Sequence, residues 1–261
     1  MDYDNIHNYI KKYKVNKKDL DYLIKYKNYE DIKDLKCDIR KVSKNYPLQH
    51  IVGNTEFYGY VFQVNNKVLI PRVETELLVE KTSNYIKQYF NKDNIKIADI
   101  CAGSGCIGIT LKNQFKKSDV VCVEKYAKAY NILDTNNQNF GNIVNTLKGD
   151  LLKPLKKEKF DLIISNPPYI SYDETVDKQV SMYEPVTALY APDNGLYFYE
   201  EILKKVSKNL KDKSMIAFEI GMKQGKELKK IANNYFKNSK IIIEKDYNKR
   251  DRFLFIFNNL V

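Results

Sequence analysis

The spacing of hydrophobic and polar positions changes twice along the 261 residues. Up to about residue 45, apolar side chains recur at helical spacing, as at Leu20, Leu23 and Ile24, and Asn16 fits a helix N-cap. These positions predict a small helical domain over residues 1–46. A helical bundle of this size is marginally stable alone, so we expect it to pack against the rest of the chain.

Aromatic and β-branched residues replace the helical pattern between residues 55 and 70. Residues 55–64 and 67–70 predict two extended segments, and Asn65-Asn66 between them is a turn signal. We therefore expect a β-hairpin that ends at Pro71. Helical spacing then returns over Glu74–Phe90.

From Ile95 onward, short apolar runs alternate with glycine turns and helical stretches. This alternation indicates βαβ units, and therefore an α/β fold with a largely parallel sheet that helices cover on both faces. The predicted strands are Ile95–Ile100, Val120–Val123, Asn145–Lys148, Phe160–Ser165, Met215–Ile220, Ile241–Lys245 and Phe253–Phe257. The predicted helices are Ile107–Phe115, Tyr126–Phe140, Leu196–Leu210 and Gly225–Phe236.

Composition is that of a chain with a packed core, because 43% of the residues are hydrophobic and 30% are charged. Lys and Arg number 44 against 33 Asp and Glu, and the resulting net charge of +11 favours nucleic acid or another acidic partner. The chain is also rich in Asn, Ile and Tyr, as an AT-rich coding sequence would make it. We therefore attribute most of the charge to solvated surface.

No apolar run reaches the length of about 18 residues that a membrane-spanning helix needs, and the first residues form no apolar signal core. The four cysteines form no Cys-x-x-Cys pair, and the histidines are His7 and His50 alone. A zinc site or a disulfide framework is therefore not expected. We expect a soluble, cytoplasmic protein with neither a metal nor a membrane partner.

A glycine-rich turn, Asp99 to Gly108, follows the first predicted strand of the sheet and opens a helix. Glycines there let the backbone turn tightly and approach a ligand closely. The spacing Gly103-x-Gly105-x-x-Gly108 matches the dinucleotide-binding fingerprint. With an acid four residues before Gly103, the stretch equally fits the nucleoside turn of S-adenosylmethionine-dependent methyltransferases. A purely structural turn is the third interpretation, and this motif alone does not choose among them.

Two further acids follow the next strands: Glu124 ends the second strand and Asp150 follows the third. The carboxyl ends of parallel strands meet at one edge of a sheet, where open α/β sheets bind ligands. We therefore expect Asp99, Glu124 and Asp150 along one rim, with Glu124 suited to the ribose hydroxyls of NAD or S-adenosylmethionine. Taken singly, each acid is equally explained as a helix cap or a solvated loop residue.

The most specific signal is Asn166-Pro167-Pro168-Tyr169, directly after the fourth predicted strand. Two prolines fix the backbone and remove two N–H donors, so the loop offers carbonyl oxygens and the Asn166 side-chain oxygen as acceptors. Such a loop suits a planar –NH2 group, against which Tyr169 can pack. A nicotinamide dehydrogenase has no need of this combination.

This tetrapeptide resembles that of the methyltransferases that act on amino groups of adenine, guanine or glutamine. Other segments resemble the release factor glutamine methyltransferases in particular, over about residues 47 to 261. They are Gln49–Gly53, Glu56–Gly59, Val68–Glu76, Tyr183–Leu189, Glu219–Gly221 with Gln224-Gly225, and Arg250–Arg252. The segment from Ile70 to Glu76 resembles this family more than the related ribosomal-protein glutamine methyltransferases.

The resemblance implies a Rossmann-like, seven-stranded class I methyltransferase sheet over residues 77–261, preceded by a linker and β-hairpin over 47–76 and by the helical domain, which docks substrate. It implies a monomeric enzyme of translation termination. That enzyme transfers the methyl group of S-adenosylmethionine to the glutamine amide of the Gly-Gly-Gln motif in peptide chain release factors, leaving S-adenosylhomocysteine. A direct nucleic-acid substrate is not implied.

The resemblance also implies roles for individual residues. The catalytic residues are Asn166, Pro167 and Tyr169, which bind substrate together with Pro168, Pro71 and Arg72. The cofactor-binding residues are Asp99, Cys101, Ala102, Gly103, Ser104, Gly105, Glu124, Asp150, Leu151 and Asn166. Two qualifications apply: Cys101 replaces the family's first turn glycine, and Arg72 is equally explained by an ion pair with a nearby glutamate.

Three other functions are compatible with parts of the pattern. A DNA or RNA amino-methyltransferase shares the turn and the tetrapeptide, and the positive charge suits phosphates. However, the chain has no separate region for target recognition. A basic binding module explains neither the acids nor the acceptor loop, and an oxidoreductase does not explain the tetrapeptide.

Overall fold

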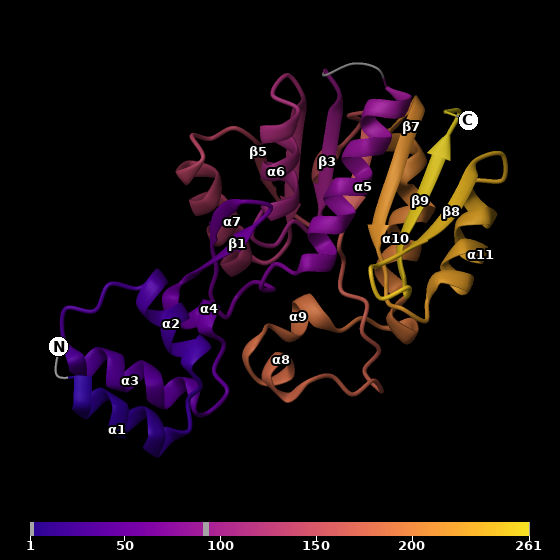
Figure 1. The fold of residues 1–261 in the computed structure, drawn as a ribbon. Coiled ribbons are helices and arrows are strands. Elements are labelled where there is room, and N and C mark those ends of the chain that lie inside the picture. The colour runs from indigo at the N-terminus through magenta and orange to yellow at the C-terminus, as the bar shows by residue number, and fades with distance from the viewer. Residues whose placement is uncertain (1–2, 91–93, 261) are drawn as a thin grey trace.

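The structure is a computed structural model that describes residues 3–90 and 94–260 (Figure 1). In this part of the chain, seven strands form one sheet in the order β5-β4-β3-β6-β7-β9-β8. β9 runs antiparallel to both of its neighbours, and the other strands are parallel. The prediction of a Rossmann-like, largely parallel sheet is confirmed. The strands are β3 (Lys96–Ile100), β4 (Asp119–Glu124), β5 (Asn145–Lys148), β6 (Phe160–Ser165), β7 (Leu210–Glu219), β8 (Lys240–Lys245) and β9 (Asp251–Asn258).

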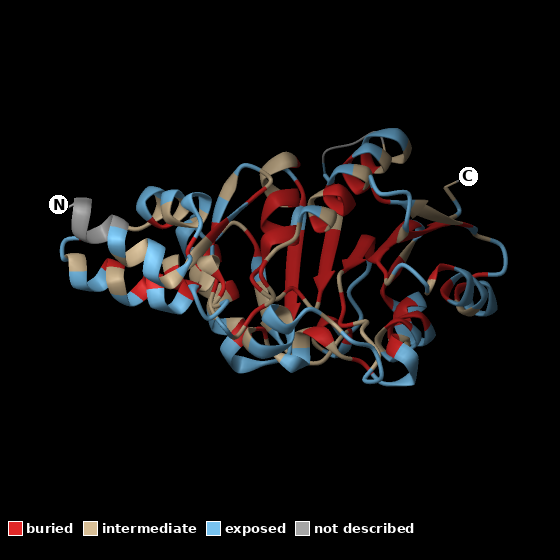
Figure 2. Ribbon diagram, turned by 60° about the horizontal axis from the view of Figure 1, so that its bottom comes forward, coloured by how far each residue is buried: buried red, intermediate tan, exposed pale blue. Residues whose placement is uncertain are grey.

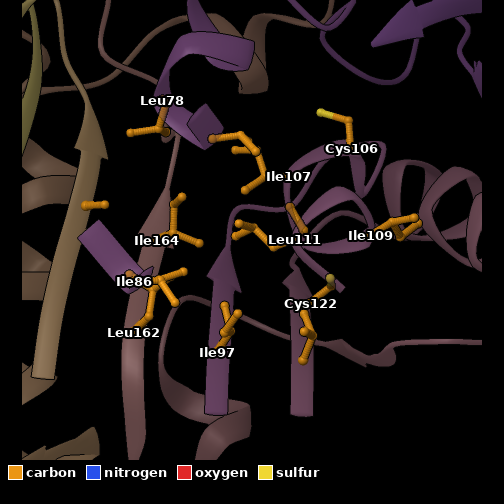
Figure 3. Close-up of a cluster of buried hydrophobic side chains, with 14 of the residues drawn as sticks. Leu78, Ile86, Ile97, Cys106, Ile107, Ile109, Leu111, Cys122, Leu162 and Ile164 are labelled. Atoms are coloured by element: carbon orange, nitrogen blue, oxygen red, sulfur yellow. The ribbon is translucent and has the colours of Figure 1, made fainter. Parts of the chain in front are cut away.

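Helices cover both faces of this sheet because side chains alternate along the central strands. On β3, Ile97 belongs to one apolar cluster, whereas Ala98 and Ile100 belong to the other. Figure 3 shows the first cluster, in which strand residues meet Leu78 of α5 and Leu111 of α6. Burying one such Leu or Ile side chain stabilises the fold by about 1.5–3 kcal/mol. The helices are α5 (Val73–Tyr89), α6 (Cys106–Gln114), α7 (Ala127–Asn139), α10 (Tyr197–Lys205) and α11 (Gly225–Tyr235).

The predicted boundaries agree within one or two residues except before β7. The helix expected up to Leu210 ends at Lys205, a 3-10 turn follows over Val206–Asn209, and β7 starts at Leu210 instead of Met215. Leu210 pairs with Phe160 of β6 across an irregular register. The longer strand therefore depends on its neighbour, which periodicity within residues 196–220 does not reveal.

The predicted β-hairpin is present, but the predicted turn is wrong. β1 (Asn54–Phe57) and β2 (Tyr60–Gln63) are joined through Tyr58 and Gly59, whose φ angles are 52° and 78°. Positive φ at both central residues is the geometry of a type I′ turn, which matches the twist of paired strands. Asn65 instead accepts a hydrogen bond from the Lys67 N–H, and residues 67–70 form no strand.

The N-terminal residues fold as four helices around a cluster of their own. They are α1 (Tyr3–Tyr13), α2 (Lys17–Tyr26), α3 (Ile32–Val42) and α4 (Leu48–Val52). Asn16 caps α2 as predicted, since its side chain accepts from the Asp19 N–H at 2.8 Å. Figure 2 shows that burial is concentrated in the sheet, whereas the faces of these helices are largely exposed or intermediate.

The N-terminal helices contact the segment after β6. That segment contains α8 (Lys178–Tyr183) and α9 (Val186–Leu189), which lie below the sheet in Figure 1. The Tyr183 hydroxyl donates to the Lys44 carbonyl at 2.9 Å, and its ring packs edge-on against Tyr46. The helical region thus packs against the rest of the chain, as we expect from its small size. None of the helices in the described residues is both long and apolar enough to cross a membrane.

Candidate active site

A cavity opens at the carboxyl ends of β3, β4 and β6. Ten of the sequence-predicted site residues line it: Pro71, Cys101, Ala102, Gly103, Ser104, Glu124, Asp150, Leu151, Asn166 and Pro168. Five others do not, namely Asp99, Gly105, Pro167, Tyr169 and Arg72. The remaining wall includes residues that sequence analysis did not assign to the site, among them Val68, Leu69, Thr75, Tyr126, Thr187 and Phe198.

The three glycines of the turn have different physical roles. A Cβ built on Gly103, which has φ of 56°, meets no atom within 4 Å, so this residue presents open backbone beside the cavity. A Cβ on Gly105 would lie 2.5 Å from Leu133 Cδ1, and one on Gly108 would lie 2.3 Å from Cys122 Sγ. Gly108 therefore permits close packing of α6 on β4, and Gly103 permits close approach of a ligand.

Cys101 is a non-glycine residue in the turn, and its backbone has φ of 61°. A side chain in this left-handed region costs about 1–2 kcal/mol, so the backbone of the turn is strained at Cys101. Burial raises the pKa of the Cys101 thiol above its usual range, with Glu124 adding to the effect. The thiol is therefore neutral where it lines the cavity.

Asp99 lies beneath the turn rather than on the cavity wall. It is fully buried, and its Oδ2 accepts from the Gly108 N–H at 3.0 Å. Its Oδ1 has no hydrogen-bond partner among the described residues. Burial raises the pKa of Asp99 to about 8, and the hydrogen bond from Gly108 opposes that shift. Asp99 thus braces the first turn of α6 against β3.

Glu124 lies at the end of β4 and does line the cavity. Its Oε2 accepts from the Gly103 N–H at 3.0 Å and its Oε1 from the Tyr126 N–H at 2.9 Å. Burial raises the pKa of Glu124, and these backbone bonds oppose the shift. Each carboxylate oxygen accepts more than one hydrogen bond, so the group retains capacity for the hydroxyls of a sugar.

Asp150 and Leu151 form the neighbouring part of the wall. Asp150 pairs with Lys153 at 2.8 Å and with Lys125 at 3.2 Å, and these two lysines lower its pKa. The carboxylate is therefore ionised, although its partners lie on an exposed surface where such pairs stabilise little.

In the acceptor loop, the Asn166 side chain is held by helix α5. Its Nδ2 donates to the Thr75 Oγ1 at 3.1 Å. Among the described residues, no hydrogen-bond partner is present at the Asn166 Oδ1, and Asn166 lines the cavity. An acceptor oxygen is thus available there. Sequence analysis placed Thr75 at the start of a helix, and no local pattern indicates that its hydroxyl reaches a loop 91 residues away.

Tyr169 anchors the same loop from below. Its carbonyl accepts from Gln224 Nε2 at 2.9 Å, and its hydroxyl lies 3.4 Å from Glu219 Oε1. A Cβ on Gly195 would lie 2.0 Å from the Tyr169 carbonyl oxygen, so a larger residue there would displace the loop. Pro167 is buried. The contacts of Tyr169 with Gln224, Glu219 and Gly195 therefore fix the shape of the acceptor loop.

The segment that carries Pro71 is fastened by Glu184. The Glu184 carboxylate accepts from the Ile70 N–H at 3.0 Å and forms an ion pair with Arg72. The expectation of an ion pair for Arg72 thus has a structural counterpart, but the partner comes from the segment before α9 and not from the neighbouring Glu74 or Glu76.

Fold and site together define a methyltransferase. A family model described as "Methyltransferase small domain" matches residues 74–183. Among solved structures, a methyltransferase from Pyrococcus furiosus is similar with a TM-score of 0.57 and 15% identity over 77% of this chain and 90% of that one. The 16S rRNA N2 G1207 methyltransferase of T. thermophilus has a TM-score of 0.58 and 14% identity over 79% and 50%. These similarities show the fold.

Curated relatives narrow the class. The release factor glutamine methyltransferase of Clostridium botulinum is 41% identical over 89% of this chain and 82% of its own length. Its counterpart in Enterococcus faecalis is 37% identical over 85% and 80%, and that of Bacillus subtilis is 37% identical over 79% and 73%. The chain belongs to the release factor glutamine methyltransferase family, as its motifs indicate.

Proposed function

We propose that this protein transfers the methyl group of S-adenosylmethionine to the side-chain amide nitrogen of a glutamine in a peptide chain release factor. The observation that carries the proposal is the Asn166 amide at the cavity wall. Its Nδ2 is engaged by Thr75, and its Oδ1 is available to accept a hydrogen bond. An acceptor of this kind suits the –NH2 of a glutamine. An oxidoreductase site, which oxidises a hydroxyl or reduces a carbonyl group, does not need it.

The cavity fits the proposed cofactor. Gly103 presents open backbone without a Cβ, and Glu124 at the strand end suits two ribose hydroxyls. Asp150 and Leu151 would flank the base, and Cys101 to Gly105 would hold the methionine portion. When bound, S-adenosylmethionine supplies an electrophilic methyl group on a sulfonium sulfur and leaves as S-adenosylhomocysteine.

The protein's task is to prepare a poor nucleophile, because the amide lone pair is delocalised into the carbonyl group. The Asn166 Oδ1 and the Pro167 carbonyl would accept the two amide hydrogens and so orient the nitrogen. Both acceptors also favour the positive charge that develops on nitrogen as its new bond to carbon forms. The nitrogen is then strongly acidic, and its extra proton passes to water. Pro168, which lines the cavity, would hold the plane of the amide group, and Tyr169 would support the loop from outside the cavity.

The acceptor glutamine is that of the Gly-Gly-Gln motif of release factors, and the place of action is the cytoplasm. Residues 1–46 would dock this protein substrate beside the catalytic domain, residues 77–261. Residues 47–76 connect the two and bring Pro71 and Arg72 to the entrance. Docking by the helical region is supported by its contact with the segment after β6, where Tyr46 packs against Tyr183. The protein would act as a monomer.

A methyl-transfer assay tests the proposal. The protein and methyl-labelled S-adenosylmethionine are incubated, in three separate reactions, with a release factor, with duplex DNA or with RNA. We expect label in the release factor and loss of that label when the Gly-Gly-Gln glutamine is replaced by alanine. Label in DNA or RNA and none in the release factor would overturn the proposal in favour of an exocyclic-amine methyltransferase.

A further inference from the structure

A buried hydrogen-bonded chain connects the acceptor loop to the end of β7. The Thr75 hydroxyl donates to Glu219 Oε2 at 2.7 Å and accepts from Asn166 Nδ2 at 3.1 Å. Glu219 is 2% exposed, and Thr75 is likewise buried. These hydrogen bonds join α5, the loop after β6 and β7. The three elements are far apart in sequence, since Thr75 and Glu219 are separated by 144 positions.

The chemistry of a hydroxyl gives this chain a direction. An asparagine side chain has a donor end and an acceptor end of nearly the same shape, so it can occupy one site in two orientations. A threonine hydroxyl has a single hydrogen. When that hydrogen is donated to an ionised Glu219, the Thr75 oxygen can only accept, and only the –NH2 end of Asn166 matches it. The Asn166 oxygen then faces the cavity.

We infer that Glu219, acting through Thr75, selects the orientation of the Asn166 amide and thereby keeps an acceptor oxygen toward the substrate nitrogen. Both are positioning residues for the reaction proposed above, and the inference rests on that function. In the reverse orientation, Asn166 would present two N–H donors to the –NH2 group of the substrate. Donor would then face donor, and the substrate amide would lose one of its two acceptors.

The charge state of Glu219 makes this selection depend on pH. Burial raises the pKa of Glu219 to about 7, while the hydrogen bond from Thr75 and the positive charge of Arg252 on β9 oppose the shift. Glu74 on α5 raises the pKa further. The other titratable groups that face Glu219 are Tyr169, Tyr199 of α10 and Cys106 of α6.

A protonated Glu219 can itself donate to the Thr75 oxygen. The Thr75 hydrogen is then released from its fixed direction, and Asn166 is no longer confined to one orientation. We therefore expect kcat to rise as the pH passes upward through about 7. In Glu219→Gln this step should be absent, because the side chain no longer titrates.

Isosteric substitution of Thr75 provides the kinetic test. Thr75→Val removes the hydroxyl and retains the shape, so kcat should fall by about 10- to 100-fold while the Kd for S-adenosylhomocysteine changes less than about twofold. Thr75→Ser restores the hydroxyl and should recover most of the turnover. Thr82→Val is the matched control, because Thr82 lies on the same helix and is fully buried without a partner for its hydroxyl in the described structure. It should leave kcat unchanged.

Two further measurements separate positioning from simple structural support. In an Asn166→Ala background, Thr75→Val should cause no additional loss, since Thr75 acts through Asn166. In NMR spectra of the wild type, the Asn166 side-chain NH2 signals should shift with an apparent pKa near 7, and Thr75→Val should remove that shift. Additive losses in the double variant, or an Asn166 signal that does not respond to pH, would overturn the inference. The NMR result does not require transfer activity, so it decides the inference even if the release factor proves not to be a substrate.

Discussion

Arg72 and Glu184 lie 112 residues apart in the sequence and form an ion pair beside the cavity. Glu184 is 6% exposed and also accepts a hydrogen bond from the Ile70 N–H. One carboxylate thus fastens the segment that contains Pro71 to the segment that precedes α9. The segment around Pro71 and the adjoining helix α9 both contribute to the cavity wall, so this pair helps to hold that part of the wall in place.

Glu184→Ala should destabilise the protein by about 1–3 kcal/mol, because it leaves the Ile70 N–H and the Arg72 guanidinium without their acceptor. Urea unfolding measures the loss. Glu174→Ala is the matched control, since Glu174 is exposed in the same segment. We also expect a higher KM for release factor in Glu184→Ala. Equal unfolding midpoints for the two variants would contradict the structural role of Glu184.

Asn166→Ala should reduce methyl transfer by about 100-fold or more while S-adenosylhomocysteine binds within a few-fold of the wild type. The variant loses an acceptor that acts on the developing charge, a change that lowers kcat in comparable sites by this order. Transfer kinetics and calorimetric titration measure the two effects. Asn139→Ala, at an exposed position of α7, serves as control. Turnover within a few-fold of the control would exclude the role assigned to Asn166.

Cys101→Gly should leave the free energy of unfolding within about 1 kcal/mol of the wild type, because relief of strain and the greater freedom of the unfolded chain offset one another. Cys101→Val should lower it by about 2 kcal/mol or more, since a β-branched residue does not tolerate φ near 61°. Cys37→Val at an exposed helical site controls for the change of side chain. The measurement is denaturant unfolding without cofactor, and equal values for the glycine and valine variants would refute this explanation.

Asp99 should make the stability of the wild type fall as the pH rises. Its folded-state pKa of about 8 exceeds the ordinary aspartate pKa of 3.8, so between these values the folded protein binds the proton more tightly than the unfolded chain does. Raising the pH therefore favours unfolding, by at most about 1.4 kcal/mol per pH unit from this group. Asp99→Asn removes the titration.

Urea unfolding between about pH 5 and about pH 8 tests this sign. The free energy of unfolding of the wild type, relative to Asp99→Asn, should decrease steadily over that interval. The comparison with Asp99→Asn cancels the contributions of other groups, such as Asp150, whose pKa is lowered. Parallel pH curves for the two proteins would show that Asp99 is already ionised in the folded state.

The net charge of +11 should affect docking more than chemistry. If part of the charge attracts an acidic release factor, higher salt should raise the KM for that substrate with little change in kcat. Steady-state kinetics at low and high ionic strength measure this effect. A KM that does not depend on salt would assign the charge to surface composition alone.

Local patterns predicted the sheet closely because most of its strands carry an apolar run of their own. Asn145–Lys148 and Phe160–Ser165 were predicted with the observed boundaries, and the other strands within one or two residues, except for the start of β7. The position predicted for the hairpin turn was wrong because two turn signals compete in this segment. Asn65-Asn66 is the stronger pattern, but Gly59 supplies the positive φ that pairing of β1 with β2 requires. Strand pairing, which is a contact between segments, decided between them.

The sequence by itself determined the chemistry that is available: a turn with glycines, acids at strand ends, and a rigid acceptor loop whose order is typical of this family. Each of these features is a short local motif, so it can be read from neighbouring residues in the sequence. The tertiary structure alone decided which groups meet. It placed Asp99 under the turn instead of on the cavity wall, paired Arg72 with Glu184, and connected Asn166 through Thr75 to Glu219. Such contacts join elements far apart in the chain, and they form only when the packing of helices on the sheet fixes where each side chain points.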